Sequence, residues 1–158
     1  MNIIRQVASS IVKFKYMKRI IIYFCVAFGI SLADTVYHIP IEGTIDLGLP
    51  PFIERSIAEA EENNAKAIIF EVNTFGGRVD AATQIKDAIL DSKVPTVAFI
   101  NKRAISAGAL ISLSCEKVFM AGGATIGATT AVDMQGNKAS EKVISYMREE
   151  MAATAEKR

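Results

Sequence analysis

The chain has 158 residues, 51% of them hydrophobic and 22% charged, a balance that suits one globular domain and excludes a disordered chain. Its formal net charge is +1, but this charge is unevenly distributed. Five of the 18 basic residues and none of the 17 acidic residues lie within residues 1–33, which leaves 13 basic and 17 acidic residues, a net −4, in the remainder. A mildly acidic body offers no electrostatic basis for binding nucleic acid.

The N-terminal segment has the pattern of an export signal. Lys18 and Arg19 precede a short apolar run, residues 20–30, which ends at the small-residue site Ser31-Leu32-Ala33. A basic region, a short apolar region and such a site are typical of a secretory signal peptide. The run is shorter than the roughly 20 apolar residues that cross a bilayer, although an uncleaved membrane anchor is the alternative. We therefore expect residues 1–33 to be a signal peptide or an N-terminal anchor, with Met17 as an alternative start. Residues 34–158 are then an exported domain, periplasmic or extracytoplasmic.

Strand-like and helix-like segments alternate after Ala33. We expect strands over Val36–Ile41, Ala67–Val72, Pro95–Ile100 and Lys117–Met120. We expect helices from Pro50, after Gly77, over Ser106–Ser114 and over Ser140–Glu156, with turns at 73–77 and 102–105 and a loop around Gly122, Gly123 and Gly127. The strands lack polar alternation, which is typical of a mostly parallel sheet with helices covering its faces. The chain ends on a helix with no finishing strand, so the domain is expected to be incomplete at its C-terminus.

Helical periodicity indicates which residues face the core. Ile53, Ile57 and Ala60 share one face of the first expected helix. The second helix points Val79, Ala82, Ile85 and Ile89 inward in the same way. Cys25 lies within the export signal, which leaves Cys115 without a disulfide partner, and we expect Cys115 to be a small buried packing residue.

Two strand ends carry residues suited to chemistry. Ligands of α/β sheets bind beyond the carboxyl ends of the strands. Gly76 and Gly77 follow one strand and permit close backbone approach, so that nearby amides could point at a carbonyl oxygen. Ser106 follows the next strand and precedes an apolar helix whose N-terminus favours a developing oxyanion. The alternatives are an ordinary strand-to-helix turn for the glycines and a simple N-cap for the serine.

Four segments in order carry a family resemblance: Ile41-Glu42-Gly43, residues 73–77 with Asp80-Ala81, residues 106–109, and residues 121–127. Together they resemble the ClpP/crotonase superfamily, and specifically the N-terminal domain of the NfeD family of membrane-associated serine proteases. The resemblance implies an α/β fold of ClpP/crotonase type, Ser106 as the nucleophile, and an oxyanion hole formed by amides near Gly76, Gly77 and Ala107. Two positions depart from the family's pattern, which usually has proline at Phe75 and a small residue at Ile105.

A serine nucleophile needs a base near neutral pH. The one histidine, His38, lies far upstream in the first strand, where a packing role is expected, so a Ser-His-Asp triad is not favoured. The resemblance implies a lysine instead, and a lysine acts as a base only when its surroundings lower its pKa. Downstream, Lys117 is expected at a solvated sheet edge and Lys138 in an exposed turn. We favour Lys142, at the start of the last helix, with Lys138 as the alternative.

The sequence therefore predicts an exported serine-type endopeptidase with a Ser106–Lys142 dyad and no cofactor. The resemblance implies that it cleaves hydrophobic segments of membrane proteins, has a stomatin-like membrane partner and forms a homo-oligomer, with a dimer as the candidate form. One alternative is a crotonase-type acyl-CoA enzyme, against which the export signal argues. Another is an inactive, truncated interaction module. One histidine and one cysteine outside the signal cannot build a usual zinc site.

Overall fold

The computed structural model describes residues 17, 34–127 and 139–158, and all that follows concerns these residues. The chain divides into two units, 1–33 and 34–158, and every labelled helix and strand belongs to the second unit. The expected export signal, apart from Met17, and Lys138 thus lie outside the described residues. Among the helices described, none has the length and apolar character needed to span a bilayer.

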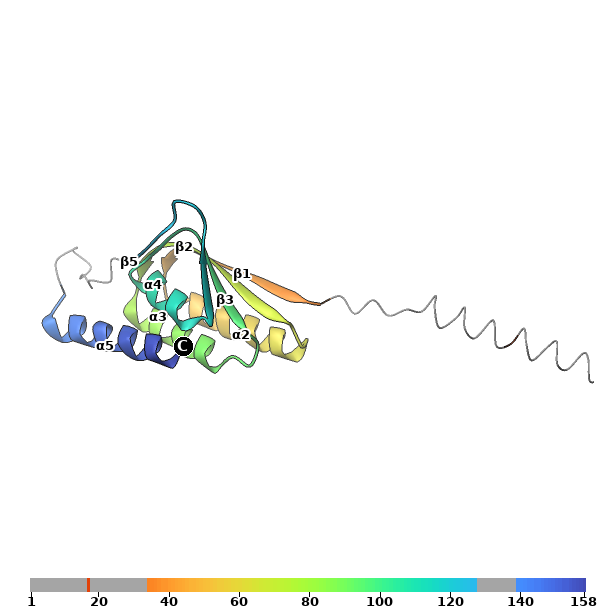
Figure 1. Ribbon diagram of the computed structural model, residues 1–158. Helices are drawn as coiled ribbons and strands as arrows, with labels where there is room; N and C mark the ends of the chain where they lie inside the picture. The colour runs from red at the N-terminus through yellow and green to blue at the C-terminus, as the bar shows by residue number, and fades with distance from the viewer. Residues whose placement is uncertain (1–16, 18–33, 128–138) are drawn as a thin grey trace, which may run out of the picture. The chain divides into compact units, whose positions relative to one another are not determined.

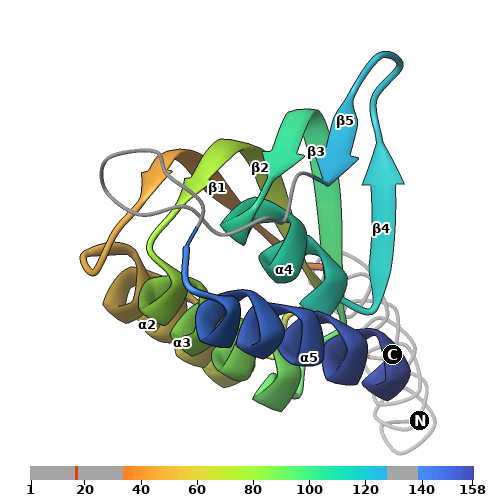
Figure 2. The same ribbon diagram turned by 90° about the vertical axis from the view of Figure 1, so that its left-hand side faces the viewer.

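A parallel sheet organises the unit (Figure 2). Its strands are β1 (Val36–Ile45), β2 (Ala67–Gly77), β3 (Thr96–Ile105), β4 (Lys117–Met120) and β5 (Thr125–Gly127). The order is β1-β2-β3-β4, and β5 continues beside the carboxyl end of β3. Every pair is parallel, which confirms the expected sheet.

The helices lie on one face of this sheet (Figures 1 and 2). They are α2 (Leu49–Glu62), α3 (Val79–Asp91), α4 (Ala107–Ser114) and α5 (Glu141–Lys157). Along β1, β2 and β3, buried residues that face the helices alternate with exposed or half-buried ones that face away. Within the described part of the chain, helices therefore cover one face of the sheet, as expected, and leave the other face uncovered.

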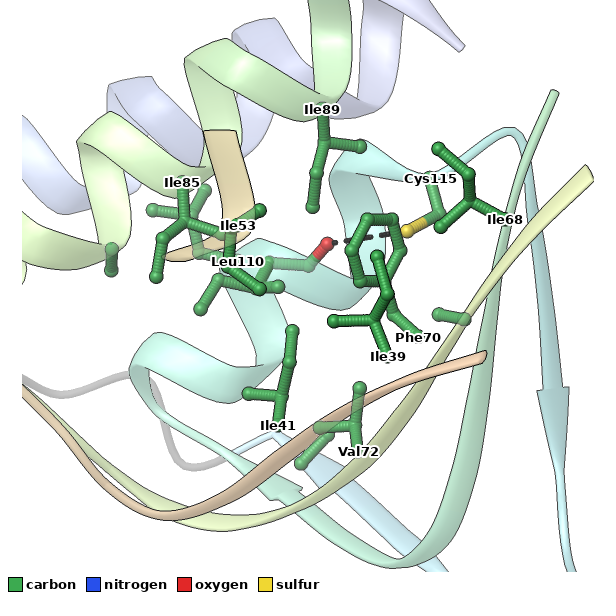
Figure 3. Packing of buried hydrophobic residues seen from close by; sticks show 14 of the residues in the cluster. Ile39, Ile41, Ile53, Ile68, Phe70, Val72, Ile85, Ile89, Leu110 and Cys115 are labelled. Carbon is green, nitrogen blue, oxygen red and sulfur yellow. Dashed lines mark hydrogen bonds between the residues drawn. The ribbon is translucent and has the colours of Figure 1, made fainter. Parts of the chain in front are cut away.

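The core forms between the sheet and these helices (Figure 3). The fully buried Phe70 lies among isoleucines from β1, α2 and α3 and Leu110 of α4. Each such side chain contributes about 1.5–3 kcal/mol when withdrawn from water. The helix residues expected to face inward are buried, apart from the partly buried Val79. Among the described residues, the members of the core lie between Ile39 and Met147, within unit 34–158.

Cys115 has the expected packing role. It is buried, its thiol lies 3.7 Å from the Ile111 carbonyl, and burial raises the pKa of that thiol to about 12. The thiol therefore stays protonated and unreactive at neutral pH.

Three strands run further than the sequence predicts, and one strand was missed. β2 continues through Gly77 and β3 through Ile105, where turns were expected, and β5 lies where a loop was expected. The reason is pairing, because the extended end of β1 places Thr44 beside Gly76 and Ile45 beside Gly77. A Cβ at Gly77 would lie 2.1 Å from the Ile45 carbonyl oxygen, so this glycine permits close strand approach rather than a turn.

Helix α5 packs parallel to α3. Tyr146 lies 3.5 Å from Thr83 near the start of both helices, and Glu150 pairs with Lys86 at 2.8 Å further along. Ser140 caps the helix by accepting a hydrogen bond from the Val143 amide, as expected. The start of α5 therefore lies at the end of α3 that follows Gly77.

Arg158 joins the far ends of three helices. Its guanidinium donates to the Ser114 carbonyl of α4 at 2.8 Å and to the Ile89 carbonyl of α3 at 3.3 Å. A cation at helix C-termini also opposes the negative end of each helix dipole. This side chain thus fastens α5 to the rest of the unit.

We predict that Arg158→Ala lowers the free energy of unfolding by about 1–2 kcal/mol, because two carbonyl groups lose a charged donor. The neighbouring, exposed Lys157 is the matched control, and Lys157→Ala should change stability by less than about 0.5 kcal/mol. Urea unfolding of the full chain measures both. Equal stability of the two variants would contradict the assigned role of Arg158.

Candidate active site

Ser106 occupies a strained backbone position between β3 and α4. Its φ is 55° and its ψ −113°, and among the described non-glycine residues only Asn64 shares a positive φ. Such a conformation costs on the order of 1–3 kcal/mol and persists where the surroundings impose it. Here the Ser106 amide donates to the Gly127 carbonyl of β5 at 2.8 Å, and its carbonyl accepts from the Ala109 amide of α4 at 2.9 Å.

The Ser106 side chain does not cap its helix. The residue occupies the N-cap position of α4, but its hydroxyl accepts no capping hydrogen bond from the first turn. The simple N-cap interpretation is therefore wrong for the side chain. A half-buried hydroxyl is held at a helix N-terminus without the usual capping role.

Gly76 brings the two predicted strand ends together. An ideal Cβ on Gly76 would lie 2.8 Å from the Ile105 carbonyl oxygen, 2.9 Å from the Ser106 Cβ and 3.3 Å from the Ala107 amide nitrogen. Its φ of +105° also disfavours any side chain. Glycine at this position is what allows the β2 end to contact Ser106 directly.

Thr74 fixes this contact and was not singled out from the sequence. Its buried hydroxyl donates to the Gly43 carbonyl and accepts from the Gly76 amide at 2.9 Å. A Cβ on Gly108 would lie 2.4 Å from the Thr74 methyl group, so the absence of a side chain at Gly108 also allows α4 to approach β2. A threonine at a buried position of an apolar strand, two residues before a glycine pair, is the signal that could have identified it.

The backbone amides near Ser106 differ in whether they already donate a hydrogen bond. The Gly76 amide already donates to Thr74, whereas Ala107 begins α4, where amides have no acceptor within the helix. The positive end of the α4 dipole lies at the same place. The site therefore offers a helix-end amide beside the serine, which is the kind of donor that stabilises an oxyanion.

Phe75 is an exposed residue of β2 directly before Gly76. The residue is 73% exposed, and the Arg103 guanidinium lies 4.4 Å from the centroid of its ring. Further along the chain, Arg78 donates to Asp80 at 2.6 Å, and this hydrogen bond lowers the pKa of the Asp80 carboxyl. Asp80 is thus ionised and engaged at neutral pH, which makes it a poor proton acceptor.

The lysines predicted as bases differ in position. Lys142 lies exposed in the first turn of α5, at the same end of the unit as Gly77, but it forms no hydrogen bond with Ser106. Lys117 is exposed on β4 beside Val97, as expected, away from the carboxyl end of β3. Lys138 lies outside the described residues.

Lys86 is a largely buried lysine that the sequence did not indicate. Burial acts to lower the pKa of Lys86, but its hydrogen bonds with Asp87 and Glu150 outweigh burial and leave the pKa raised. Lys86 therefore stays protonated and holds α5 on α3, so it is unsuited to act as a base.

His38 does not pack in the core, contrary to expectation. Its ring is exposed and its Nε2 lies 2.7 Å from Glu71 Oε2, in the amino-terminal half of β1. That position is at the opposite end of the sheet from Ser106, which removes His38 as its base. The described residues contain no group of three side chains arranged to hold a metal ion.

The fold places this chain among proteins of ClpP-like architecture. It is similar to 1510-N, a membrane-bound stomatin-specific protease solved as a serine-to-alanine variant, with a TM-score of 0.73 and 33% identity over 79% of this chain and 65% of that chain. It is also similar to ClpP1 from Listeria monocytogenes, with a TM-score of 0.63 and 22% identity over 77% of this chain and 73% of that chain. The second likeness shows the fold alone.

Sequence comparison identifies the family. A family model described as the NfeD1b N-terminal domain matches residues 35–158. The membrane protein NfeD1b of Bacillus subtilis strain 168 is 43% identical over 124 residues, covering 78% of this chain and 28% of the relative. The membrane-bound protease PH1510 of Pyrococcus horikoshii is 37% identical over 119 residues, covering 71% of this chain and 27% of that relative. The chain belongs to the NfeD1b family through this domain, and it spans little more than a quarter of the length of these relatives.

We predict that Gly76→Ala lowers the free energy of unfolding by roughly 2 kcal/mol or more, because the new methyl group would overlap backbone atoms at an unfavourable φ. Gly122→Ala is the matched control, since nothing lies within 4 Å of a Cβ at that position. Thermal unfolding of both variants measures the difference. A Gly76→Ala protein as stable as the Gly122→Ala protein would contradict the described contact with Ser106.

Proposed function

We propose that this domain is a serine-type endopeptidase with Ser106 as its nucleophile. The observation that carries the proposal is the strained Ser106, whose hydroxyl caps nothing and whose Cβ contacts the glycine at the end of β2. The names of the relatives support it, since PH1510 is named a protease and 1510-N a stomatin-specific protease. The fold alone would also suit an acyl-CoA enzyme of the crotonase type, but the names of these relatives favour the peptidase.

In the proposed reaction, the Ser106 Oγ attacks the carbonyl carbon of a peptide bond and its proton passes to a base. The carbonyl oxygen becomes an oxyanion, which we assign to the amides of Gly77, at the end of β2, and Ala107, at the start of α4. The C–N bond then breaks, the leaving amine takes the proton, and an acyl-enzyme remains. Water hydrolyses this ester through the same base. Gly76, whose amide already binds Thr74, contributes mainly its lack of a side chain.

We assign the base to Lys142, with Lys138 as the alternative. Lys142 lies at the end of the unit where β2 gives way to α3, and residues 128–138 link its helix to Gly127, which binds the Ser106 amide. A lysine-to-alanine variant of 1510-N, solved in complex with a substrate peptide, supports a lysine in this role. A neutral amine within reach of the serine hydroxyl is the chemical requirement for this assignment.

The proposed substrates are hydrophobic segments of membrane proteins, and a stomatin-like protein is the proposed partner. The relative 1510-N is described as stomatin-specific, and related chains are named membrane proteins. The exposed Phe75, directly before Gly76, offers an apolar contact for such a segment. The proposed location is outside the cytoplasm, and the proposed assembly is a homo-oligomer.

We predict that a fluorophosphonate probe labels the full chain and that Ser106→Ala abolishes both labelling and peptide cleavage, with a loss of at least about 1000-fold. The exposed Ser145 of α5 provides the matched control, and Ser145→Ala should be labelled as well as the unchanged chain. Mass spectrometry of the labelled peptide gives the site. A folded chain that takes up no probe would instead support the inactive interaction module.

We predict that Lys142→Ala lowers the cleavage rate by about 10²–10⁴-fold, since a positioned base contributes that much. Lys138→Ala tests the alternative, and Lys157→Ala, at the distant end of α5, controls for loss of surface charge. Steady-state cleavage of an apolar peptide measures all three. Full activity of Lys142→Ala together with loss in Lys138→Ala would move the base to Lys138.

A further inference from the structure

Arg103 is a cation near the candidate site that has no carboxylate partner in the described part of the chain. It precedes Ser106 by three residues in β3 and is half-buried. The ion pairs of the described residues do not include it, and the arginine side chains that donate hydrogen bonds there are Arg78 and Arg158. A guanidinium stays charged and carries five N–H donors, so a half-buried one without an acceptor is suited to bind an anion.

The ring of Phe75 holds this guanidinium. The guanidinium carbon of Arg103 lies 4.4 Å from the centroid of the ring, within the range of a cation–π contact. This contact restrains the long arginine side chain but supplies no carboxylate oxygen to its N–H groups. A side chain that is already restrained loses less freedom when it binds a ligand, which favours binding.

Phe75 and Arg103 lie at the end of the sheet that carries the candidate site. Gly76 of β2 and Ala104 of β3 are buried, and side chains alternate along a strand, so Phe75 and Arg103 share the face that points away from the helices. Gly76 contacts Ser106, and Arg103 is roughly 10 Å from Ser106 along β3. An extended peptide that is cleaved at Ser106 would therefore bring a side chain about two or three residues from the cleaved bond to Arg103.

The other carboxylates on this face do not satisfy Arg103. Glu71 uses both of its oxygens, one 2.7 Å from His38 Nε2 and the other accepting from the Asn101 amide at 2.6 Å. Glu42 is on β1, and β2 lies between β1 and β3, which puts about two strand spacings, roughly 9.6 Å, between Glu42 and Arg103. The anion for Arg103 must therefore come from outside the part of the chain that the structure describes.

We propose that Arg103 determines specificity by binding a carboxylate of the substrate, about two or three residues from the cleaved bond. The proposal rests on the proposed function and narrows its apolar substrates to segments with a carboxylate near the point of cleavage. An aspartate or glutamate side chain, or the free end of the segment, could supply this group. The planar guanidinium can donate two parallel hydrogen bonds to it, which gives the contact its selectivity.

Cleavage of matched peptides by the full chain tests the proposal. The probes are amidated apolar peptides that carry one glutamate or one glutamine, moved from position to position. We expect glutamate at one position to lower KM by roughly tenfold relative to glutamine, with little change in kcat, because the contact is made before and during reaction. Arg103→Gln should remove this preference, and Arg103→Glu should transfer it to a lysine at the same position.

Lys102→Gln is the matched control, because Lys102 is the exposed cation next to Arg103 and its loss changes the net charge equally. This variant should keep the glutamate preference. Glutamine peptides with a free rather than an amidated C-terminus show whether the chain end supplies the carboxylate instead of a side chain. The proposal is wrong if the unchanged chain has no carboxylate preference, if the preference survives Arg103→Gln, or if Lys102→Gln removes it equally.

Binding to the Ser106→Ala chain separates this proposal from the proposed reaction. Fluorescence anisotropy of labelled peptides measures their affinity without cleavage. A roughly tenfold tighter complex with the glutamate peptide, lost in the additional Arg103→Gln variant, would support the carboxylate site even if the unchanged chain cleaves nothing. Cleavage without a carboxylate preference would refute the role of Arg103 and leave the nucleophile in place. A chain that binds neither peptide would also overturn the proposal.

The positioning role of Phe75 has its own readout, the ratio of glutamate to glutamine peptide cleavage. Phe75→Leu should lower this ratio by roughly threefold, because an apolar side chain without a ring does not hold the guanidinium. Phe75→Tyr should preserve the ratio, since its ring can take the same contact. Equal ratios in the leucine and tyrosine variants would show that the ring does not position Arg103.

Discussion

The contact between Gly76 and Ser106 is the constraint on which the site depends. The end of β2 reaches the start of α4 because Gly76 has no side chain, and Ile105, Ser106 and Ala107 occupy the space that a Cβ would need. Thr74 holds the glycine from one side by binding its amide, and Gly127 holds the serine from the other. These hydrogen bonds stabilise a backbone conformation at Ser106 that an isolated chain would avoid.

The sheet and its helices could be predicted because apolar periodicity and cap residues are local signals. Ser140 and the inner faces of α2 and α3 follow directly from such patterns. The extended ends of β1, β2 and β3 could not be predicted, since Gly76 and Gly77 resemble turn residues until pairing with β1 places them in a strand. Thr74 was missed and His38 misplaced for a similar reason, because each is defined by a residue about thirty positions away.

Ser106 itself was identified as a candidate from the sequence, but its distinction from a helix cap needed the structure. The backbone angles and the absence of a capping bond separate the two roles. Lys142 is the reverse case, because its helix and cap were predicted correctly, but it forms no hydrogen bond with Ser106 and its role as the base stays a prediction. The ion pairs of Lys86 and the hydrogen bonds of Arg158 fix the direction of α5. They explain why its first residues, rather than its last, lie at the end of the unit that carries Ser106.

The most direct measurement is a crystal structure of the chain after reaction with a fluorophosphonate, whose phosphoryl oxygen stands in for the oxyanion of peptide cleavage. Our account predicts a covalent bond to the Ser106 Oγ, with the phosphoryl oxygen about 2.7–3.1 Å from the amides of Gly77 and Ala107. Gly76 should remain in contact with the Ser106 Cβ. An adduct on another side chain, or an oxygen turned away from both amides, would contradict the assignment of this site.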